Sequence, residues 1–206
     1  MTLQALDLVE TLTRRVRLLS VEQAKRICCP SGTTEKPLAF DWRPLEASGL
    51  IGKARLSLRQ LVPTAPLCTW HPGDEEPDFD ALAIHVRSRW SIPPRSVEVL
   101  WATPGAAALF GSSAGRLPAM HQREHDLLLA DAYVHYRLHQ PGLARLWRGE
   151  DCRPKAGFRI KDPDAFLVDG CGRIERVIES SGRYSLRQLT DFHDYCASER
   201  LPYDLW

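Results

Sequence analysis

Two short apolar runs separated by a tight turn constrain the fold of this 206-residue chain more than any other feature. The first run, residues 164–168, reads DAFLV, and the second, residues 174–179, ends in Glu179. The turn sequence DGCG between them favours an antiparallel hairpin. Such a hairpin places Asp164, at the head of one strand, beside Glu179, at the tail of the next.

The segments around this hairpin predict a layered domain. Residues 121–139 form an apolar stripe through Leu128, Ala132 and Tyr136, which indicates a long helix. Ser185 is a candidate N-cap for a helix over residues 185–200, and the sequence PYDLW predicts a last strand. The order helix, strands, helix, strand is typical of an α/β sandwich.

The front of the chain has a different pattern. Apolar residues at spacings of three and four predict a helix over residues 3–18, and Ser20 with Gln23 forms a candidate capping box for a second. A third helix is expected over about 35–48, ending at Gly49. Residues 50–61 alternate as a half-exposed basic strand, with residues 65–73 as its expected hairpin partner.

Three short helices followed by a basic hairpin is the element order of a winged helix. We therefore expect an α+β or α/β protein with an N-terminal winged-helix domain, residues 1–78, followed by an α/β domain, residues 79–206. The stretch PGDEEPDFD at the junction is rich in proline and acids, as linking segments are. A helix is expected directly after it, then a strand over residues 96–103.

The distribution of charge is more informative than the net charge of +1. Residues 1–60 hold ten Lys and Arg against six Asp and Glu, whereas residues 61–86 hold five acids and no Lys or Arg. A basic front is compatible with a nucleic-acid face. Because the sequence shows neither a membrane-length apolar run nor a signal peptide, and no CxxC pair, we expect a cytoplasmic protein with reduced thiols and no membrane partner.

Asp164 and Glu179 are candidate metal ligands. Hydrolysis of a phosphodiester with Mg²⁺ or Mn²⁺ requires hard oxygen ligands and a positive group near the attacking water. Two carboxylates meeting at one edge of a sheet satisfy the first requirement. Glu124 or Asp126, on the long helix, is positioned to add a third carboxylate.

Residues from about 121 to 206 resemble the PD-(D/E)xK nuclease superfamily, with Pro163-Asp164 and Glu179 in the matching positions. The whole chain is similar to the replication-relaxation family of plasmid and mobile-element proteins. The segments that carry this similarity are LLSVEQAKRI, ASGLI, HDLLLADAYV, PDAFLV and ESSGRYSLRQL. The resemblance implies a winged helix, a restriction-endonuclease-like domain, binding to double-stranded DNA, and catalytic roles for Asp164 and Glu179.

The chain departs from the superfamily pattern at Ser181, where a lysine normally assists the nucleophile. Arg187 on the following helix, or Arg183 in the turn, is a candidate replacement. An arginine stabilises developing phosphate charge but does not act as a general base. We therefore expect a site that is weak or inactive as an endonuclease.

If the front of the chain is a winged helix, its third helix enters the major groove and its hairpin lies along the phosphates. The basic residues that would contact DNA are Lys36, Arg43, Lys53, Arg55 and Arg59. Each phosphate contact adds affinity without sequence preference.

Three alternatives remain open at this point. The first is an active Mg²⁺-dependent DNA endonuclease that uses the same acids. The second is a protein-binding subunit of a larger nucleic-acid-processing complex, which exposed apolar area around Trp90, Trp101 and Phe110 would favour. The third is a zinc hydrolase, because residues 121–125 spell the motif HxxEH.

Overall fold

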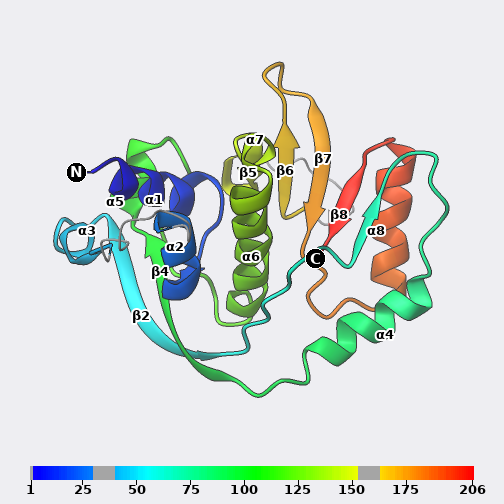
Figure 1. The fold of residues 1–206 in the computed structure, drawn as a ribbon, viewed down its shortest axis with the longest axis horizontal. Helices are drawn as coiled ribbons and strands as arrows, with labels where there is room; N and C mark the ends of the chain where they lie inside the picture. The colour runs from blue at the N-terminus through cyan, green and yellow to red at the C-terminus, as the bar shows by residue number, and fades with distance from the viewer. Residues whose placement is uncertain (1, 30–39, 153–162) are drawn as a thin grey trace.

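The computed structural model describes residues 2–29, 40–152 and 163–206, which form a mixed α+β structure with two sheets (Figure 1). The helices are α1 (Leu3–Arg14), α2 (Val21–Cys28), α3 (Arg43–Ala47), α4 (Phe79–Arg89), α5 (Pro104–Leu109), α6 (Arg123–His139), α7 (Pro141–Ala144), α8 (Leu186–Ser198) and the 3-10 helix η1 (Glu150–Cys152). The strands are β1 (Leu19–Ser20), β2 (Ile51–Leu58), β3 (Cys68–Trp70), β4 (Arg95–Ala102), β5 (Trp147–Gly149), β6 (Ala165–Val168), β7 (Ile174–Glu179) and β8 (Tyr203–Leu205).

The first sheet has the order β1-β4-β2, and both pairings are antiparallel. Helix α1 ends at Arg14 rather than at residue 18, because the chain must turn for Leu19 and Ser20 to pair with β4. The predicted capping box at the start of α2 is confirmed: the Ser20 hydroxyl accepts from the Gln23 amide, and the Gln23 side chain accepts from the Ser20 amide.

Helix α3 begins at Arg43 with Pro44 in its first turn, where a proline is tolerated. Gly49 follows it in the left-handed conformation (φ +68°), and the Leu50 amide donates to the Leu45 carbonyl, so the predicted glycine stop is confirmed. The part of the expected third helix over 35–39 lies outside the described residues.

The predicted hairpin partner of β2 is wrong. Strand β2 pairs over eight residues with β4, from Ile51 opposite Ala102 to Leu58 opposite Arg95. The expected partner, residues 65–73, contains β3, whose three residues pair with β8 in the second sheet. An eight-residue strand is matched better by the eight residues of β4 than by this short segment. The chain between β2 and β4 therefore crosses to the second sheet and returns.

The second sheet has the order β3-β8-β7-β6-β5, in which β7 and β8 are parallel and the other neighbours are antiparallel. Its last part follows the order α6, α7, β5, η1, β6, β7, α8, β8. The predicted succession of a helix, two strands, a helix and a strand is confirmed by α6, β6, β7, α8 and β8, whereas α7 and β5 were not predicted. Alternate residues face opposite sides: Ala165 and Ile178 join one core cluster, whereas Phe166 and Val177 join another.

Helix α6 lies between the two halves of the molecule (Figure 1). Its buried residues from Leu129 to Tyr136 contribute to one cluster that also contains residues of α1, α2, β4, β5, β6 and β7, whereas Leu127 joins a smaller cluster with β2 and β4. The opposite face of the second sheet is covered by α4 and α8. The halves are thus joined by a shared core as well as by the chain. None of the helices in the described ranges is both long and apolar enough to cross a membrane.

A buried acid ties the second sheet together. Asp204 of β8 is 4% exposed and accepts hydrogen bonds from the Thr69 hydroxyl (2.8 Å), the Arg176 guanidinium (2.6 Å) and the Tyr136 hydroxyl. The donors come from β3, β7 and α6, so this carboxylate links two neighbouring strands and the central helix.

Candidate functional site

Asp164 and Glu179 lie next to each other, as the hairpin predicts. Ala165 pairs with Ile178, which places Asp164, just before β6, opposite Glu179 at the end of β7. The Asp164 amide donates to Glu179 Oε2 (3.1 Å), and the Ser180 amide donates to Asp164 Oδ2 (2.8 Å). Both acids are almost fully buried. Main-chain donors therefore fix each carboxylate against the neighbouring strand.

Each acid also contacts a polar side chain that sequence reasoning did not assign to the site. His125 Nε2 of α6 lies 2.9 Å from Asp164 Oδ2, and His125 Nδ1 lies 3.5 Å from Asp126 Oδ1. The Tyr184 hydroxyl donates to Glu179 Oε1. The one available signal for Tyr184 was its place in the glycine-bearing turn after Glu179.

The histidine geometry does not follow the HxxEH interpretation. His121 is exposed and precedes α6, which begins at Arg123, so it does not share a helical face with His125. The His125 imidazole instead lies close to two aspartates, Asp164 and Asp126.

Ser181 is buried beneath an arginine that sequence reasoning missed. Arg89, at the end of α4, donates to Ser181 Oγ (2.6 Å) and to the main-chain oxygen of Trp206 (2.7 Å). Burial lowers the pKa of Arg89 to about 10. A guanidinium thus contacts Ser181, the residue at which the sequence resemblance would place a lysine. The predicted replacement Arg187 is 89% exposed and pairs with Asp191 on α8, so it lies on the outer face of that helix.

An open pocket of about 810 Å³ lies at the edge where the two acids meet. Its lining includes Asp164, His125, Tyr184, three arginines (Arg17, Arg59 and Arg183) and two further acids (Glu124 and Glu150). Glu124 is therefore placed in the same pocket as Asp164. Its carboxylate, however, accepts from the Arg59 amide (2.8 Å) and lies 3.9 Å from the Arg183 guanidinium.

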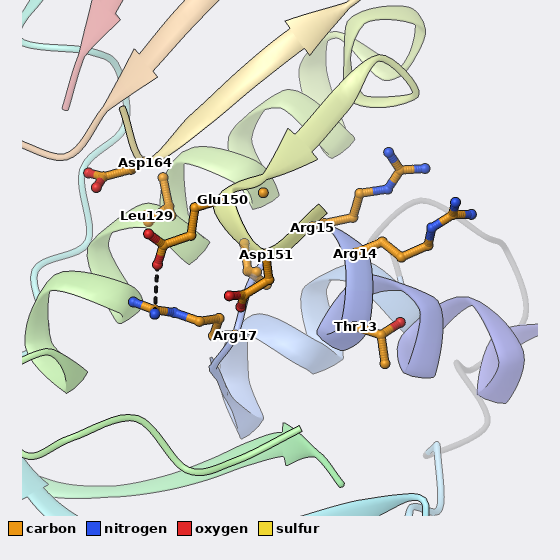
Figure 2. A pocket seen from close by; sticks show the side chains of 10 residues that line it. Thr13, Arg14, Arg15, Arg17, Leu129, Glu150, Asp151 and Asp164 are labelled. Atoms are coloured by element: carbon orange, nitrogen blue, oxygen red, sulfur yellow. Dashed lines mark ion pairs between the residues drawn. The ribbon is translucent and has the colours of Figure 1, made fainter. Parts of the chain in front are cut away.

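Arg17 links the front of the chain to the acids of the site. Its guanidinium lies 2.9 Å from Asp126 and 2.6 Å from Glu150, as Figure 2 shows for the second pair. Burial alone would lower the pKa of Arg17, but the charges of Asp126 and Glu150 outweigh it and the pKa is raised. Burial also raises the pKa of Glu150, which Arg17 opposes. Arg17 thus supplies a positive group among these buried acids, and the His125 imidazole lies beside two of them.

The donor set fits a divalent cation only in part. Asp164 and Glu179 are hard oxygen ligands of the kind that Mg²⁺ and Mn²⁺ prefer, and water completes such shells. Within the described parts of the chain, however, no three His, Cys, Asp or Glu side chains are grouped so as to hold a metal ion. The two acids also accept hydrogen bonds from main-chain amides and a tyrosine, which compete with a metal for the same oxygens.

The predicted DNA-contacting residues have acidic neighbours. Arg43 pairs with Asp41 through two 2.9 Å hydrogen bonds. Lys53 and Arg55 of β2 both pair with one residue of β4, Glu98, at 3.5 and 3.2 Å. Arg59 faces Glu124 in the pocket, at 3.4 Å. Lys36 lies outside the described residues.

The comparisons with known proteins do not assign this chain to a family. Comparison of the chain with protein-family models, with curated proteins and with solved structures found no match.

Proposed function

We propose that this chain is a DNA-binding protein of a plasmid or other mobile element, with a winged-helix-like front and a nuclease-like core whose site is altered. One observation carries the proposal: Asp164 and Glu179 meet across β6 and β7, beside an open pocket lined by three arginines. Acids at that position, with cations around them, suit a surface that handles a phosphodiester backbone.

The element order supports both parts. The order α6, β5, β6, β7, α8, β8, with β7 parallel to β8, agrees with the core of the nuclease superfamily that the sequence resembles. The front order α1, β1, α2, α3, β2, β4, with sheet order β1-β4-β2, agrees with a winged helix whose wing contains a long insertion.

The alteration of the site is argued from its hydrogen bonds. The oxygens that would hold a metal accept from Asp164 N, Ser180 N and the Tyr184 hydroxyl. The guanidinium of Arg89 is engaged by Ser181 and Trp206. An arginine in that place provides charge but no general base. The proposal is therefore binding with little or no cleavage.

Binding is tested by gel-shift titration of a duplex of about 30 base pairs at several salt concentrations. We expect binding that weakens steeply as salt rises, because each neutralised phosphate releases a counterion. The variant Asp164→Asn is expected to bind as well as the wild type if it remains folded by circular dichroism. Absence of a shift even at low salt would remove the proposal.

An active endonuclease is the second candidate, favoured by the access that the open pocket gives to Asp164. Supercoiled plasmid is incubated with Mg²⁺ or Mn²⁺ and with wild type, Asp164→Asn or Glu179→Gln. We expect no cleavage above the buffer control for any of them. Cleavage by the wild type that falls at least tenfold in both variants would replace binding with catalysis as the function, whereas equal nicking by all three indicates contamination.

The alternative that the chain is a protein-binding subunit of a larger nucleic-acid-processing complex has less support. Trp90 is 6% exposed, and Trp101 and Phe110 pack against buried clusters, so these aromatic residues do not form the exposed apolar surface that would favour it.

A further inference from the structure

Four arginines gather where the end of α1 meets α7 and β5. They are Arg14 and Arg15 at the end of α1, Arg145 after α7, and Arg148 in β5, and we refer to them as the arginine seam. The Arg148 guanidinium donates to the carbonyls of Arg145 (3.1 Å) and Trp147 (2.9 Å). The Arg15 guanidinium donates to the same two carbonyls, at 3.5 Å for Arg145. Two guanidiniums are thus held together by one short stretch of backbone.

The close contact between α1 and β5 is built into the sequence. Gly149 has no side chain, and a Cβ at that position would lie 2.6 Å from the Arg15 carbonyl oxygen. The fully buried Trp147 donates from its indole to the same oxygen (2.9 Å). The backbone segments of α1 and β5 that carry Arg15 and Arg148 are therefore held in a fixed arrangement.

Within the described residues, the ion pairs of the seam involve only two of its four arginines. Glu10 pairs with Arg14 (3.8 Å) and Arg15 (3.4 Å), whereas Arg145 and Arg148 form no ion pair with the acids in the described ranges. Burial and the charges of Arg15 and Arg14 lower the pKa of Arg148. Figure 2 shows that Arg14 and Arg15 extend away from Glu150 and Asp151.

The basic residues predicted to contact DNA in the winged helix, where the structure describes them, are instead each in contact with an acid. Lys53 and Arg55 share Glu98, and Arg43 is held by Asp41. A cation already paired with a carboxylate must give up that contact before it binds a phosphate, whereas an uncompensated arginine does not. Guanidinium groups also bind phosphate oxygens in a bidentate manner.

We propose that the arginine seam is the main phosphate-contacting surface for duplex DNA, ahead of the wing. This inference rests on the proposed function, because it names the surface through which DNA binding occurs. Binding at the seam would also place the DNA next to the pocket of Asp164. One narrow cavity connects the two regions, and its lining includes Arg14, Arg15, Arg17, Glu150 and Asp164.

The test compares two double variants that each remove two positive charges. Arg14→Gln with Arg145→Gln changes the seam at two exposed side chains, and Lys53→Gln with Arg55→Gln changes the wing. In duplex titrations at about 100 mM salt, we expect the seam variant to lose at least tenfold in affinity and the wing variant less than threefold. The slope of log affinity against log salt is expected to fall by about 2 for the seam variant.

The outcomes separate the two proposals. Normal affinity in the seam variant, or a larger loss in the wing variant, overturns the seam while the DNA-binding function stands. A wild-type chain that binds no duplex overturns both. Binding of polyglutamate through the same seam, without duplex binding, assigns the surface to an acidic protein and also overturns the inference. Thermal unfolding of both variants excludes misfolding as the cause, and the Arg14→Lys, Arg145→Lys pair, which keeps both charges, is expected to recover the salt slope but only part of the affinity.

Discussion

Replacing Asp204 with alanine is expected to lower the free energy of unfolding by roughly 3–5 kcal/mol. The substitution leaves the Arg176 guanidinium and the Tyr136 hydroxyl without their buried acceptor, and Thr69 loses its partner on the neighbouring strand. A buried charge that loses its counter-charge costs much more than the pair contributes to stability. Urea unfolding followed by circular dichroism measures the change.

The matched control is Asp191→Ala, which removes an acid of the same kind from the exposed surface of α8. Its effect is expected to stay within about 0.5 kcal/mol. Asp204→Asn, which keeps an acceptor but removes the charge, should lie between the two. If the free energy of unfolding of Asp204→Ala lies within about 1 kcal/mol of the wild-type value, the three hydrogen bonds of Asp204 do not stabilise the packing of β3, β7 and α6.

Asp131→Asn is expected to stabilise the protein at high pH. Asp131 lies in α6 with 2% of its surface exposed, and burial raises its pKa to about 7, opposed by Gln23 and by Arg26 at 3.6 Å. The folded chain therefore holds a proton that the unfolded chain loses near pH 4. Between these values the folded state binds more protons, so its stability falls as the pH rises through this range.

Full ionisation of Asp131 in the folded protein costs roughly 4 kcal/mol, given its pKa of about 7. Because the structure relaxes in part around the charge, we expect Asp131→Asn to raise the free energy of unfolding at pH 8 by about 2–4 kcal/mol. Near pH 4 the two proteins should unfold at nearly the same urea concentration. The control Glu22→Gln alters an exposed acid of α2 and should show no such divergence. A constant difference between Asp131→Asn and the wild type at both pH values would contradict the assignment.

The sequence predicts those features that depend on residues close to one another along the chain. The hairpin of β6 and β7 requires only two apolar runs and a turn, and it brings Asp164 and Glu179 together without reference to the rest of the chain. The capping box of Ser20 and the glycine stop at Gly49 are local in the same sense.

Contacts between distant segments were not predictable in this way. Residues 65–73 have strand character, but the strand within them pairs with β8 and not with β2, and no pattern within the segment distinguishes these partners. Arg89 and His125 reach the site from α4 and α6, which are far from β7 in the chain. The wing cations were candidates because they are basic, whereas Glu98, which pairs with two of them, becomes their neighbour only through the β2–β4 pairing.

The route of the chain between β2 and β4 has a consequence for biosynthesis. The chain leaves the first sheet after β2, and β8, the strand that pairs with β3 within the described residues, follows about 135 residues later. During translation, β4 can pair with β2 while the main-chain groups of residues 68–70 still face solvent. An unpaired edge of this kind invites association with other nascent chains. Because β3 lies between β2 and β4 in the chain but belongs to the second sheet, we expect limited proteolysis at a single bond between the halves not to release two fragments that refold separately.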